Sequence, residues 1–303
     1  MRQVVDKVMD AGGKPFLTDT TTLYSGSRHN AVDHLQTAYL HGFAPSVVRA
    51  PVIIADGLYG ENDVPVRIKA KHFKDVHIAT EIRRAPSMVV LSHFKGHEMA
   101  GFGGAIKNLA MGGASVPGKK DQHATHVQVD EKTCVGCGKC VKACPQKALS
   151  LRKKKSQVDV NRCIGCFECI TVCPVKAISL DWATEMTPFM ERLTEYAYGA
   201  VKGRQKRICY INFVLNVTPD CDCVAWSDAP LVPDLGILAS TDPVALDQAC
   251  FDLVNKAPSL DPKLDGDAPD KFTARWPNTR GDVQLSYGEE LGMGSRKYKL
   301  EKI

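Results

Sequence analysis

A cysteine pattern that occurs twice in the middle of the chain constrains its fold more than any other feature. The run "CVGCGKCVKACP" begins at Cys134, and the run "CIGCFECITVCP" begins at Cys163. Both have the spacing C-x2-C-x2-C-x3-C-P. Three closely spaced thiolates of this kind hold one face of an iron–sulfur cube, and the fourth cysteine reaches a second cube. The repeat therefore predicts two [4Fe–4S] clusters with crossed ligands.

Each cluster would take three cysteines from one run and the fourth from the other. The first is assigned to Cys134, Cys137, Cys140 and Cys173, and the second to Cys163, Cys166, Cys169 and Cys144. Two other interpretations of the cysteines are structural zinc and a disulfide framework. Zinc sites usually use paired C-x2-C knuckles, and disulfides fit poorly with a cytosolic chain.

Composition narrows the class of protein. The chain has 303 residues, of which 44% are hydrophobic and 24% charged, as in an ordinary globular protein with a substantial core. No apolar run reaches the roughly 18 residues that a membrane span needs, and the first residues contain no secretory signal. We therefore expect a cytoplasmic protein, in a compartment where thiols stay free to bind metal.

The net charge of +5 is concentrated in the middle of the chain. Between Thr125 and Ala177 there are ten Lys and Arg residues against four Asp and Glu. The run "RKKK" at 152–155 is either a solvated loop or a docking patch for an acidic redox partner, such as an acidic ferredoxin or a reductase subunit. No aromatic stacking pattern accompanies it, so nucleic acid is not an expected partner.

Helix and strand signals alternate on both sides of the cysteine runs, which indicates an α/β fold. The pattern predicts helices at 2–13, 30–43, 187–203 and 241–257. Asn30, Thr187 and Asp242 are the expected caps of the last three. Strands are expected at 14–19, 51–57, 64–70, 87–93, 207–217 and 235–240, with the strand at 207–217 buried. The tail from Pro258 is expected to run extended over the surface.

We predict a mixed, partly parallel sheet with helices on both faces, interrupted by a small α+β insert. The α/β domain would comprise 1–124 and 180–303, and the insert 125–179, with short strands at 127–129 and 158–160. Because α/β domains commonly open with a strand and this chain opens on a helix, its first strand is expected to be missing or supplied by another chain.

The stretch "SHFKGHEMAGFGGAIKNLAMGG", from Ser92 to Gly113, holds the densest set of candidate site residues. It follows a strand, and open α/β sheets bind ligands at the carboxyl ends of strands. Its glycines precede a helix whose amides would hold an anionic cofactor near Lys107. A tight turn and ordinary histidines are the other interpretations. The candidates in this stretch are His93, Lys95, His97, Gly101, Gly103, Gly104 and Lys107.

Two further segments carry candidate residues. Cys221 and Cys223 are two positions apart, so on an extended segment their thiols would point the same way and share a metal or form a redox pair. They could equally be two unrelated thiols. Arg28, in the polar loop at 19–30, is a candidate for contact with an anionic ligand. Cys209 and Cys250 lie in apolar runs and are expected to be buried hydrophobic residues.

Resemblances to known families extend these predictions. The cysteine segment resembles bacterial-type two-cluster ferredoxins over its full length. Together with that insert, "SHFKGHEMAGFGGAIKNLAMG", "CDC" and "VPDLGILASTDPVALDQAC" resemble the DUF362 family of uncharacterised iron–sulfur proteins. Members generally have a further N-terminal strand-bearing segment, so the resemblance implies a truncated or alternative start. "AGFGGAIKN" is also faintly similar to the glycine-rich loop of the nickel-pincer lactate racemases, over too few residues to transfer any role.

These features favour a redox protein that passes electrons through two clusters to a site on the α/β domain. If that site is catalytic, the enzyme class is a ferredoxin-dependent oxidoreductase. An electron-transfer subunit with a non-catalytic docking domain is the second hypothesis. The third is a metal- or cofactor-handling protein, with a further metal or organic cofactor at the histidines and the CxC pair. The sequence contains no strand–GxGxxG–helix dinucleotide fingerprint and specifies neither substrate nor oligomeric state.

Overall fold

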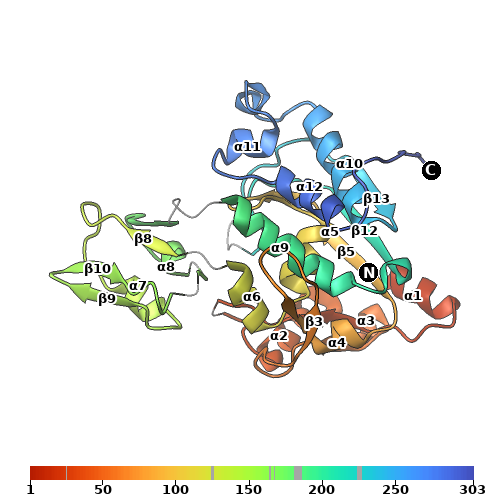
Figure 1. Ribbon diagram of the computed structural model, residues 1–303, viewed down its shortest axis with the longest axis horizontal. Helices are drawn as coiled ribbons and strands as arrows, with labels where there is room; N and C mark the ends of the chain where they lie inside the picture. Colours follow the sequence, from red (N-terminus) through yellow and green to blue (C-terminus); the bar gives the residue numbers. More distant parts are fainter. Residues whose placement is uncertain (25, 124–125, 164, 167, 181–185, 224–226) are drawn as a thin grey trace. The chain divides into compact units, whose positions relative to one another are not determined.

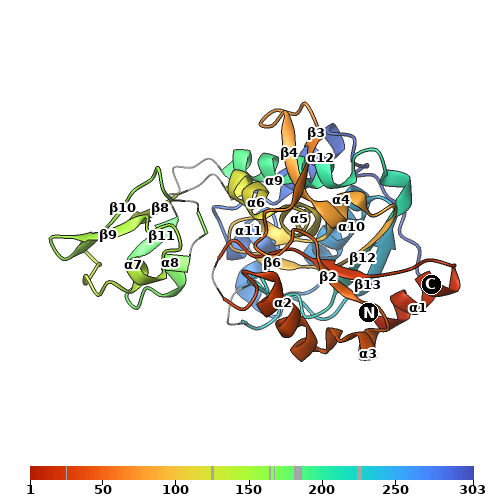
Figure 2. The same ribbon diagram turned by 90° about the horizontal axis from the view of Figure 1, so that it is seen from below.

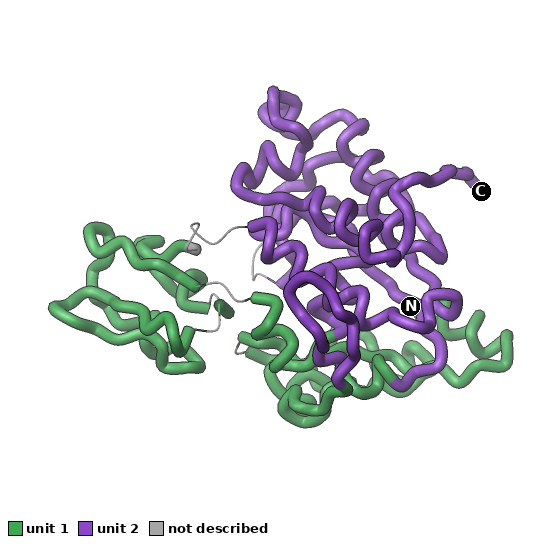
Figure 3. The backbone as a smooth tube through the Cα atoms, viewed as in Figure 1, with its two compact units in different colours: residues 1–64, 79–83, 114–184 green, residues 65–78, 84–113, 185–303 purple. Residues whose placement is uncertain are grey.

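The computed structural model describes residues 1–303 except 25, 124–125, 164, 167, 181–185 and 224–226. Short strands alternate with helices (Figures 1 and 2), so the predicted mixed α/β class is confirmed. Figure 3 shows its two compact units. Unit 1 comprises 1–64, 79–83 and 114–184, and unit 2 comprises 65–78, 84–113 and 185–303. Within the described ranges, no helix combines the length and the apolarity needed to cross a bilayer.

The centre of unit 2 is a mixed three-stranded sheet. Its strands are β5 (Met88–His93), β12 (Ile208–Val214) and β13 (Gly236–Ser240). β12 lies in the middle, parallel to β5 and antiparallel to β13. Buried and half-buried residues alternate along β12 and none is exposed, in agreement with the prediction of a buried strand. Because β5 and β12 are parallel, the segments that follow them leave from the same edge of the sheet.

The segment after β5 folds more tightly than the sequence indicated. It forms an antiparallel hairpin of β6 (Lys95–His97) and β7 (Gly101–Gly103). A short helix α5 (Ala105–Lys107) and a π-helical turn η2 (Asn108–Gly112) follow. His93 and His97 therefore lie on two successive strands, which agrees with the helix-breaking effect of the glycine between them.

The two long helices of unit 2 are α9 (Met186–Val201) and α10 (Pro243–Lys256). The carboxylate of Asp242 accepts the amides of Val244 and Ala245, so the predicted cap of α10 is confirmed. The predicted cap of α9 is wrong, because that helix begins at Met186 and contains Thr187 within its first turn. Short helical turns precede β12 and α11, at η3 (Gln205–Arg207) and η4 (Pro262–Asp265).

The tail is part of the core of unit 2, which corrects the prediction of an extended surface tail. It contains the helices α11 (Lys271–Arg275) and α12 (Asp282–Glu290). Phe272 of α11 is 1% exposed, and its ring centroid lies 5.7 Å from that of Phe102 and 6.0 Å from that of Phe94. These aromatic contacts hold the β6–β7 hairpin on the tail, so burial of large apolar rings fixes a segment whose polar composition suggested a loop.

Unit 1 contains a parallel strand pair, β1 (Leu17–Asp19) and β2 (Val52–Ile54). Asn30 caps the helix that follows β1 by accepting the amide of Asp33, as predicted, and Gly42 adopts a positive φ of 85° where the helical segment ends. Its other elements are α1 (Arg2–Asp10), α2 (Ala31–Ala38), η1 (Tyr39–Phe43), α3 (Pro45–Val48) and α6 (Val116–His123). Three elements straddle the unit boundaries, namely the paired strands β3 (Asp63–Arg67) and β4 (Asp75–Ala79) and the helix α4 (Thr80–Arg84).

The cysteine segment has two small antiparallel sheets and two short helices. Strand β8 (Val127–Val129) pairs with β11 (Ile178–Leu180), and β9 (Leu149–Arg152) pairs with β10 (Lys155–Val158). The strand predicted at 127–129 is confirmed. The strand predicted at 158–160 begins three residues earlier, at Lys155, and ends at Val158. The helices α7 (Lys139–Ala143) and α8 (Glu168–Thr171) each contain the third cysteine of a run and end before the fourth. The predicted boundaries of this segment as a domain remain a prediction.

Candidate metal and thiol sites

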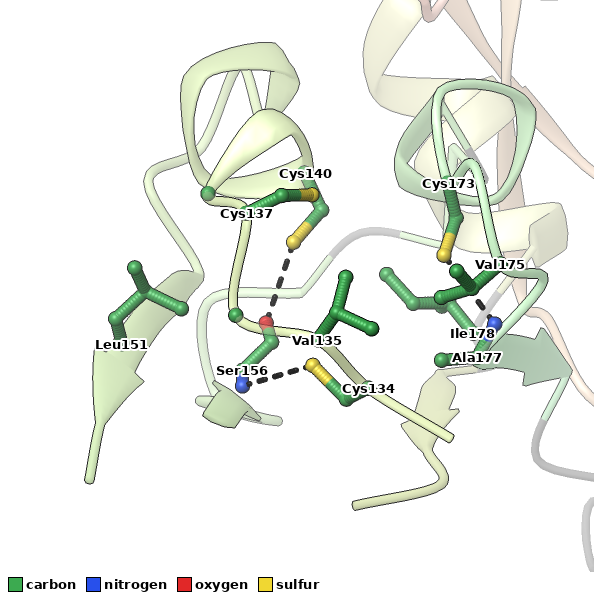
Figure 4. Close-up of a pocket in the computed structure, with 12 residues that line it drawn as sticks. Cys134, Val135, Cys137, Cys140, Leu151, Ser156, Cys173, Val175, Ala177 and Ile178 are labelled. Atoms are coloured by element: carbon green, nitrogen blue, oxygen red, sulfur yellow. Dashed lines mark hydrogen bonds between the residues drawn. The ribbon is translucent and has the colours of Figure 1, made fainter. Parts of the chain in front are cut away.

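One small cavity in the cysteine segment collects the four sulfurs assigned to the first cluster. Figure 4 shows that the loop at 134–140 lines one side of it and Cys173 another. The cysteines in its wall are Cys134, Cys137, Cys140 and Cys173, with apolar neighbours that include Val135, Leu151, Val175 and Ile178. The structure therefore brings three cysteines of the first run together with the fourth cysteine of the second.

Backbone hydrogen bonds that recur in both halves explain this crossing. The amide of Asp130 donates to the carbonyl of Ala177, and the amide of Asp159 donates to the carbonyl of Ala148, both at 2.8 Å. Asp130 precedes the first cysteine loop, whereas Ala177 follows the last cysteine of the second run. Each loop is thus anchored to the turn that carries the other run's fourth cysteine.

Those turns have the same construction. In "CPQKA" and "CPVKA" the lysine adopts a left-handed conformation, with φ of 49° at Lys147 and 51° at Lys176. This turns the next amide back, so that Ala148 donates to Cys144 Sγ and Ala177 donates to Cys173 Sγ, each at 3.2 Å. Amides that point at thiolate sulfur stabilise its negative charge and tune a bound cluster.

The second set of cysteines is also close together. The pKa of Cys169 is raised to about 12 by burial and by the neighbouring Cys166, Cys163 and Cys144. Burial raises the pKa of Cys166 as well, with Cys144 and Cys163 among its neighbours. Sulfurs in such a group gain a proton unless a cation compensates their charge, and a bound metal does so. The set contains the predicted fourth cysteine, Cys144.

Ser156 gives the first set two additional donors. Its amide lies 3.4 Å from Cys134 Sγ, and its hydroxyl lies 3.3 Å from Cys140 Sγ (Figure 4). The residue is 1% exposed and lies on β10, so the hairpin of β9 and β10 positions both contacts. The sequence analysis missed Ser156, because nothing in "KKKSQV" distinguishes it from a surface serine.

The second candidate site lies in unit 2, where the β6–β7 hairpin meets the segment after β12. The amide of Gly96 donates to the carbonyl of Thr218 at 2.7 Å. A Cβ at Gly96 would lie 2.3 Å from the Pro219 carbonyl oxygen, so only glycine allows this approach. The indole of Trp276 holds the same carbonyl at 2.9 Å. This contact fixes the CxC segment beside the hairpin.

Three of the predicted site residues converge there. His97, Cys221 and Cys223 each offer one metal-ligating atom, and these atoms lie within 4.8 Å of one another. His97 and Cys221 are buried, at 7% and 5% exposure, whereas Cys223 is exposed. The pKa of Cys221 lies well below its usual value because the Cys223 thiol donates a hydrogen bond to its sulfur, with help from Lys107 and His97. Cys221 is therefore the more acidic sulfur of the pair.

His93 and Lys95 hold the residue between the two cysteines. His93 Nδ1 lies 2.9 Å from the Asp222 carboxylate and Lys95 Nζ lies 3.3 Å from it. His93 Nε2 faces the Leu215 carbonyl at 2.8 Å. Both ring nitrogens therefore face acceptors and must donate, and the bond to Asp222 raises the pKa of His93. His93 positions the CxC segment and has no free lone pair for a metal.

Lys107 completes the group, since its Nζ lies 3.7 Å from Cys221 Sγ. Gly103 lies beside both lysines, since a Cβ there would be in ordinary van der Waals contact with Lys107, at 3.5 Å, and with Lys95 Nζ, at 3.7 Å. The catalytic candidates named from the sequence thus lie around one thiol pair. Asp222 was missed, although it stands between the two cysteines.

The helix start beside the glycines is occupied by a group of the chain itself. The amides of Ala105 and Ile106 both donate to the Asp247 carboxylate at 2.8 Å. Asn212 donates to the same carboxylate at 2.7 Å, and a Cβ at Gly104 would lie 2.4 Å from it. Asp247, which comes from α10, therefore takes the place expected for an external anion. The amphipathic pattern of that helix gave no sign of this role.

Arg28 belongs to unit 1. Its guanidinium donates to the Tyr24 hydroxyl at 2.6 Å. In the same unit Lys119 is buried, donates to Thr20 Oγ1 at 2.6 Å, and has its pKa lowered to about 8, chiefly by burial. The Asp56 carboxylate nearby accepts the amide of Thr21. The role of Arg28 in binding an anion stays a prediction. Of the two remaining cysteines, Cys250 is fully buried and Cys209 half-buried.

Fold and sites together define a mixed α/β protein that combines a repeated four-cysteine motif, suited to metal binding, with a separate thiol pair. A family model described as a domain of unknown function, DUF362, matches residues 1–252. The chain therefore belongs to the DUF362 family, and that part of the resemblance is confirmed. A search of the curated proteins gives no match.

Proposed function

We propose that the chain is an iron–sulfur redox protein with two [4Fe–4S] clusters. The observation that carries the proposal is the cavity that joins Cys134, Cys137 and Cys140 to Cys173 from the second run. A structural zinc ion takes four ligands, which two C-x2-C knuckles supply. Such a site would not require three cysteines from one run and the fourth from the other. Amides directed at the sulfurs of Cys144 and Cys173 also suit a cluster ligand.

All-cysteine clusters of this type take up and release single electrons at low potential. The protein supplies the ligands and the donors on their sulfurs. It also supplies the exposed Lys153 and Lys154 on the turn between β9 and β10, which would attract an acidic redox partner. A reducing compartment such as the cytoplasm would keep the ligands free.

The thiol pair Cys221–Cys223 is the proposed destination of the electrons. It lies among His97, Lys107 and the Lys95–Asp222 pair, which gives it a fixed and positively charged environment. A protein whose α/β part only docked a partner would have no need of this convergence. The arrangement therefore favours an oxidoreductase over a pure electron-transfer subunit.

The experiment is a count of the electrons that the clusters accept. Anaerobically purified protein is reduced with a low-potential donor, and the paramagnetic resonance signal is integrated. The proposal predicts about two unpaired electrons per chain from two clusters. A chain without any iron–sulfur signal would contradict it.

Metal handling is the second candidate, and it is favoured by the three converging ligand atoms of His97, Cys221 and Cys223. It predicts one metal ion per chain beyond the cluster iron, lost when Cys221 and Cys223 are both changed to serine. Zinc and nickel analysis of the two proteins decides between an additional metal and a metal-free thiol pair.

A further inference from the structure

We propose that Cys221 and Cys223 form a reversible intrachain disulfide that exchanges two electrons with an external disulfide substrate. The inference rests on the proposed function, because the low-potential iron–sulfur clusters are the reductant that it names. The sulfurs lie within 4.8 Å of each other and both are free thiols in the structure.

The hydrogen bonds of His97 favour a thiol pair over a metal site. Its Nδ1 accepts the amides of Met99 at 3.1 Å and Ala100 at 3.2 Å. A neutral ring that accepts at Nδ1 carries its proton on Nε2. Neither nitrogen then offers a free lone pair to a metal, whereas an N–H is suited to a thiolate.

The charged groups around the pair also favour a thiol pair over a metal site. The ammonium of Lys107 lies 3.7 Å from Cys221 Sγ, and the ammonium of Lys95 lies 3.3 Å from Asp222. Lys107 is a cation close to the sulfur, which opposes the binding of a metal ion and stabilises a thiolate, whereas Lys95 is paired with the Asp222 carboxylate. Lys107 and His97 both hydrogen-bond to the buried sulfur, which favours negative charge at Cys221.

The two sulfurs differ in access, which assigns their roles. Cys223 is exposed and Cys221 is buried. Cys223 passes its proton to the Cys221 sulfur that it hydrogen-bonds, and its own sulfur then bonds to one sulfur of the substrate disulfide and displaces the other as a thiolate. The displaced thiolate takes the proton from Cys221 and leaves as a thiol. The Cys221 thiolate then bonds to Cys223 Sγ and displaces the second substrate thiolate. One substrate disulfide is reduced, and the 221–223 disulfide is formed.

The cycle closes when two electrons and one proton return to this disulfide. The S–S bond breaks, the proton goes to Cys223 Sγ, and Cys221 Sγ keeps its negative charge beside Lys107. The eight cysteines of the two runs would hold two one-electron clusters, which would provide the two electrons that a disulfide requires. The stoichiometry therefore links the two sites without any additional cofactor.

The first test is a thiol count. The tryptic peptide 208–256 contains four cysteines, at 209, 221, 223 and 250. After treatment with diamide and alkylation under denaturing conditions, we expect the wild-type peptide to carry two alkyl groups, and four if dithiothreitol precedes alkylation. The peptide from the Cys209→Ser control should carry one alkyl group after diamide treatment and three if dithiothreitol precedes alkylation. Four groups in oxidised wild type would overturn the proposal.

The second test is a reductive titration of the oxidised full-length protein with reduced methyl viologen. We expect wild type to take up about two electrons more per chain than the Cys221→Ser, Cys223→Ser variant. Equal uptake, or one metal ion per chain lost in the variant, would overturn the proposal. If the clusters were absent, uptake by the variant would fall to zero while the peptide would still report the disulfide, so the two failures are distinguishable.

Discussion

The backbone amide of Asp130 donates to the carbonyl oxygen of Ala177 at 2.8 Å. This bond joins the start of the first cysteine loop to the turn after the second run, and its counterpart joins Asp159 to Ala148. It supports the proposed crossed ligation, because the amide of Ala177 also donates to Cys173 Sγ.

The crossing predicts which cluster each fourth cysteine serves. Cys144→Ala should remove the second cluster and leave the first, so that iron falls from about eight to about four per chain. Cys173→Ala should do the converse, and Cys209→Ala should change neither. Resonance spectra of the reduced variants distinguish the remaining clusters. If Cys144→Ala gave the same residual spectrum as Cys134→Ala, the crossed assignment would be wrong.

The lysines of the "RKKK" run have different roles, and this sharpens a prediction about docking. Lys153 and Lys154 are exposed and have positive φ values of 49° and 59°, whereas Lys155 Nζ donates to the Cys134 carbonyl at 2.5 Å. Changing Lys153→Asn and Lys154→Gly removes two charges, and the Asn-Gly pair is compatible with the positive φ values of this turn. We expect slower reduction by an acidic donor protein at low salt, with the difference fading above about 0.15 M salt.

The control for that measurement changes two exposed lysines elsewhere, Lys297→Gln and Lys302→Gln. Stopped-flow reduction is followed for both proteins across a salt series. If the turn variant and this control were slowed equally, the turn would be no more than a solvated loop.

Gly96 gives a prediction about the packing of the thiol site. A methyl group there would lie 2.3 Å from the backbone oxygen of Pro219, which cannot rotate away. Gly96→Ala should therefore lower the free energy of unfolding by about 1 to 3 kcal/mol and make Cys221 accessible to alkylation. Gly266→Ala is the matched control, because the nearest atom to its Cβ lies 3.9 Å away, and it should stay within about 0.5 kcal/mol. Urea unfolding and timed alkylation measure both effects, and equal behaviour of the two variants would refute this account.

Asp247 predicts a dependence of stability on pH. Burial raises its pKa to about 6, from an ordinary value of 3.8. The folded chain thus binds this proton more tightly than the unfolded chain, so the contribution is present below pH 3.8 and is lost as the pH rises to about 6. The unfolding free energy of wild type minus that of Asp247→Asn should fall by about 1 to 3 kcal/mol across this window.

The comparison for Asp247 is Asp10→Asn, which removes an exposed carboxyl of α1. The unfolding free energy of wild type minus that of Asp10→Asn should not fall across the same pH window. A flat difference curve for Asp247→Asn as well would mean that the buried carboxylate titrates normally and that the amides of Ala105 and Ile106 compensate its burial.

Local signals predicted much of the fold. Apolar periodicity located most strands and long helices, and the side chains of Asn30 and Asp242 cap helices as expected because capping depends on neighbouring residues. The tail after Pro258 was predicted wrongly. Its composition is polar, yet Phe272 and Leu285 are buried by residues far away in the sequence, and no local pattern reports such contacts.

Prediction of the candidate sites was limited in the same way, because local patterns do not report contacts between residues far apart in the sequence. Spacing alone grouped the eight cluster cysteines, and the cavity reproduces the first set. Spacing could not show that Asp247 fills the helix start or that Asp222 binds His93, since those partners are 142 and 129 residues apart in the chain. Long-range polar contacts of this kind depend on the tertiary fold and leave no periodic signature.

The most direct test of the account is the iron and acid-labile sulfide content of the full-length protein purified without oxygen. Two [4Fe–4S] clusters predict about eight iron atoms and about eight sulfides per chain. Zinc at about two ions per chain, with no labile sulfide, would contradict the central claim and would make the crossed cysteine motif a structural metal site.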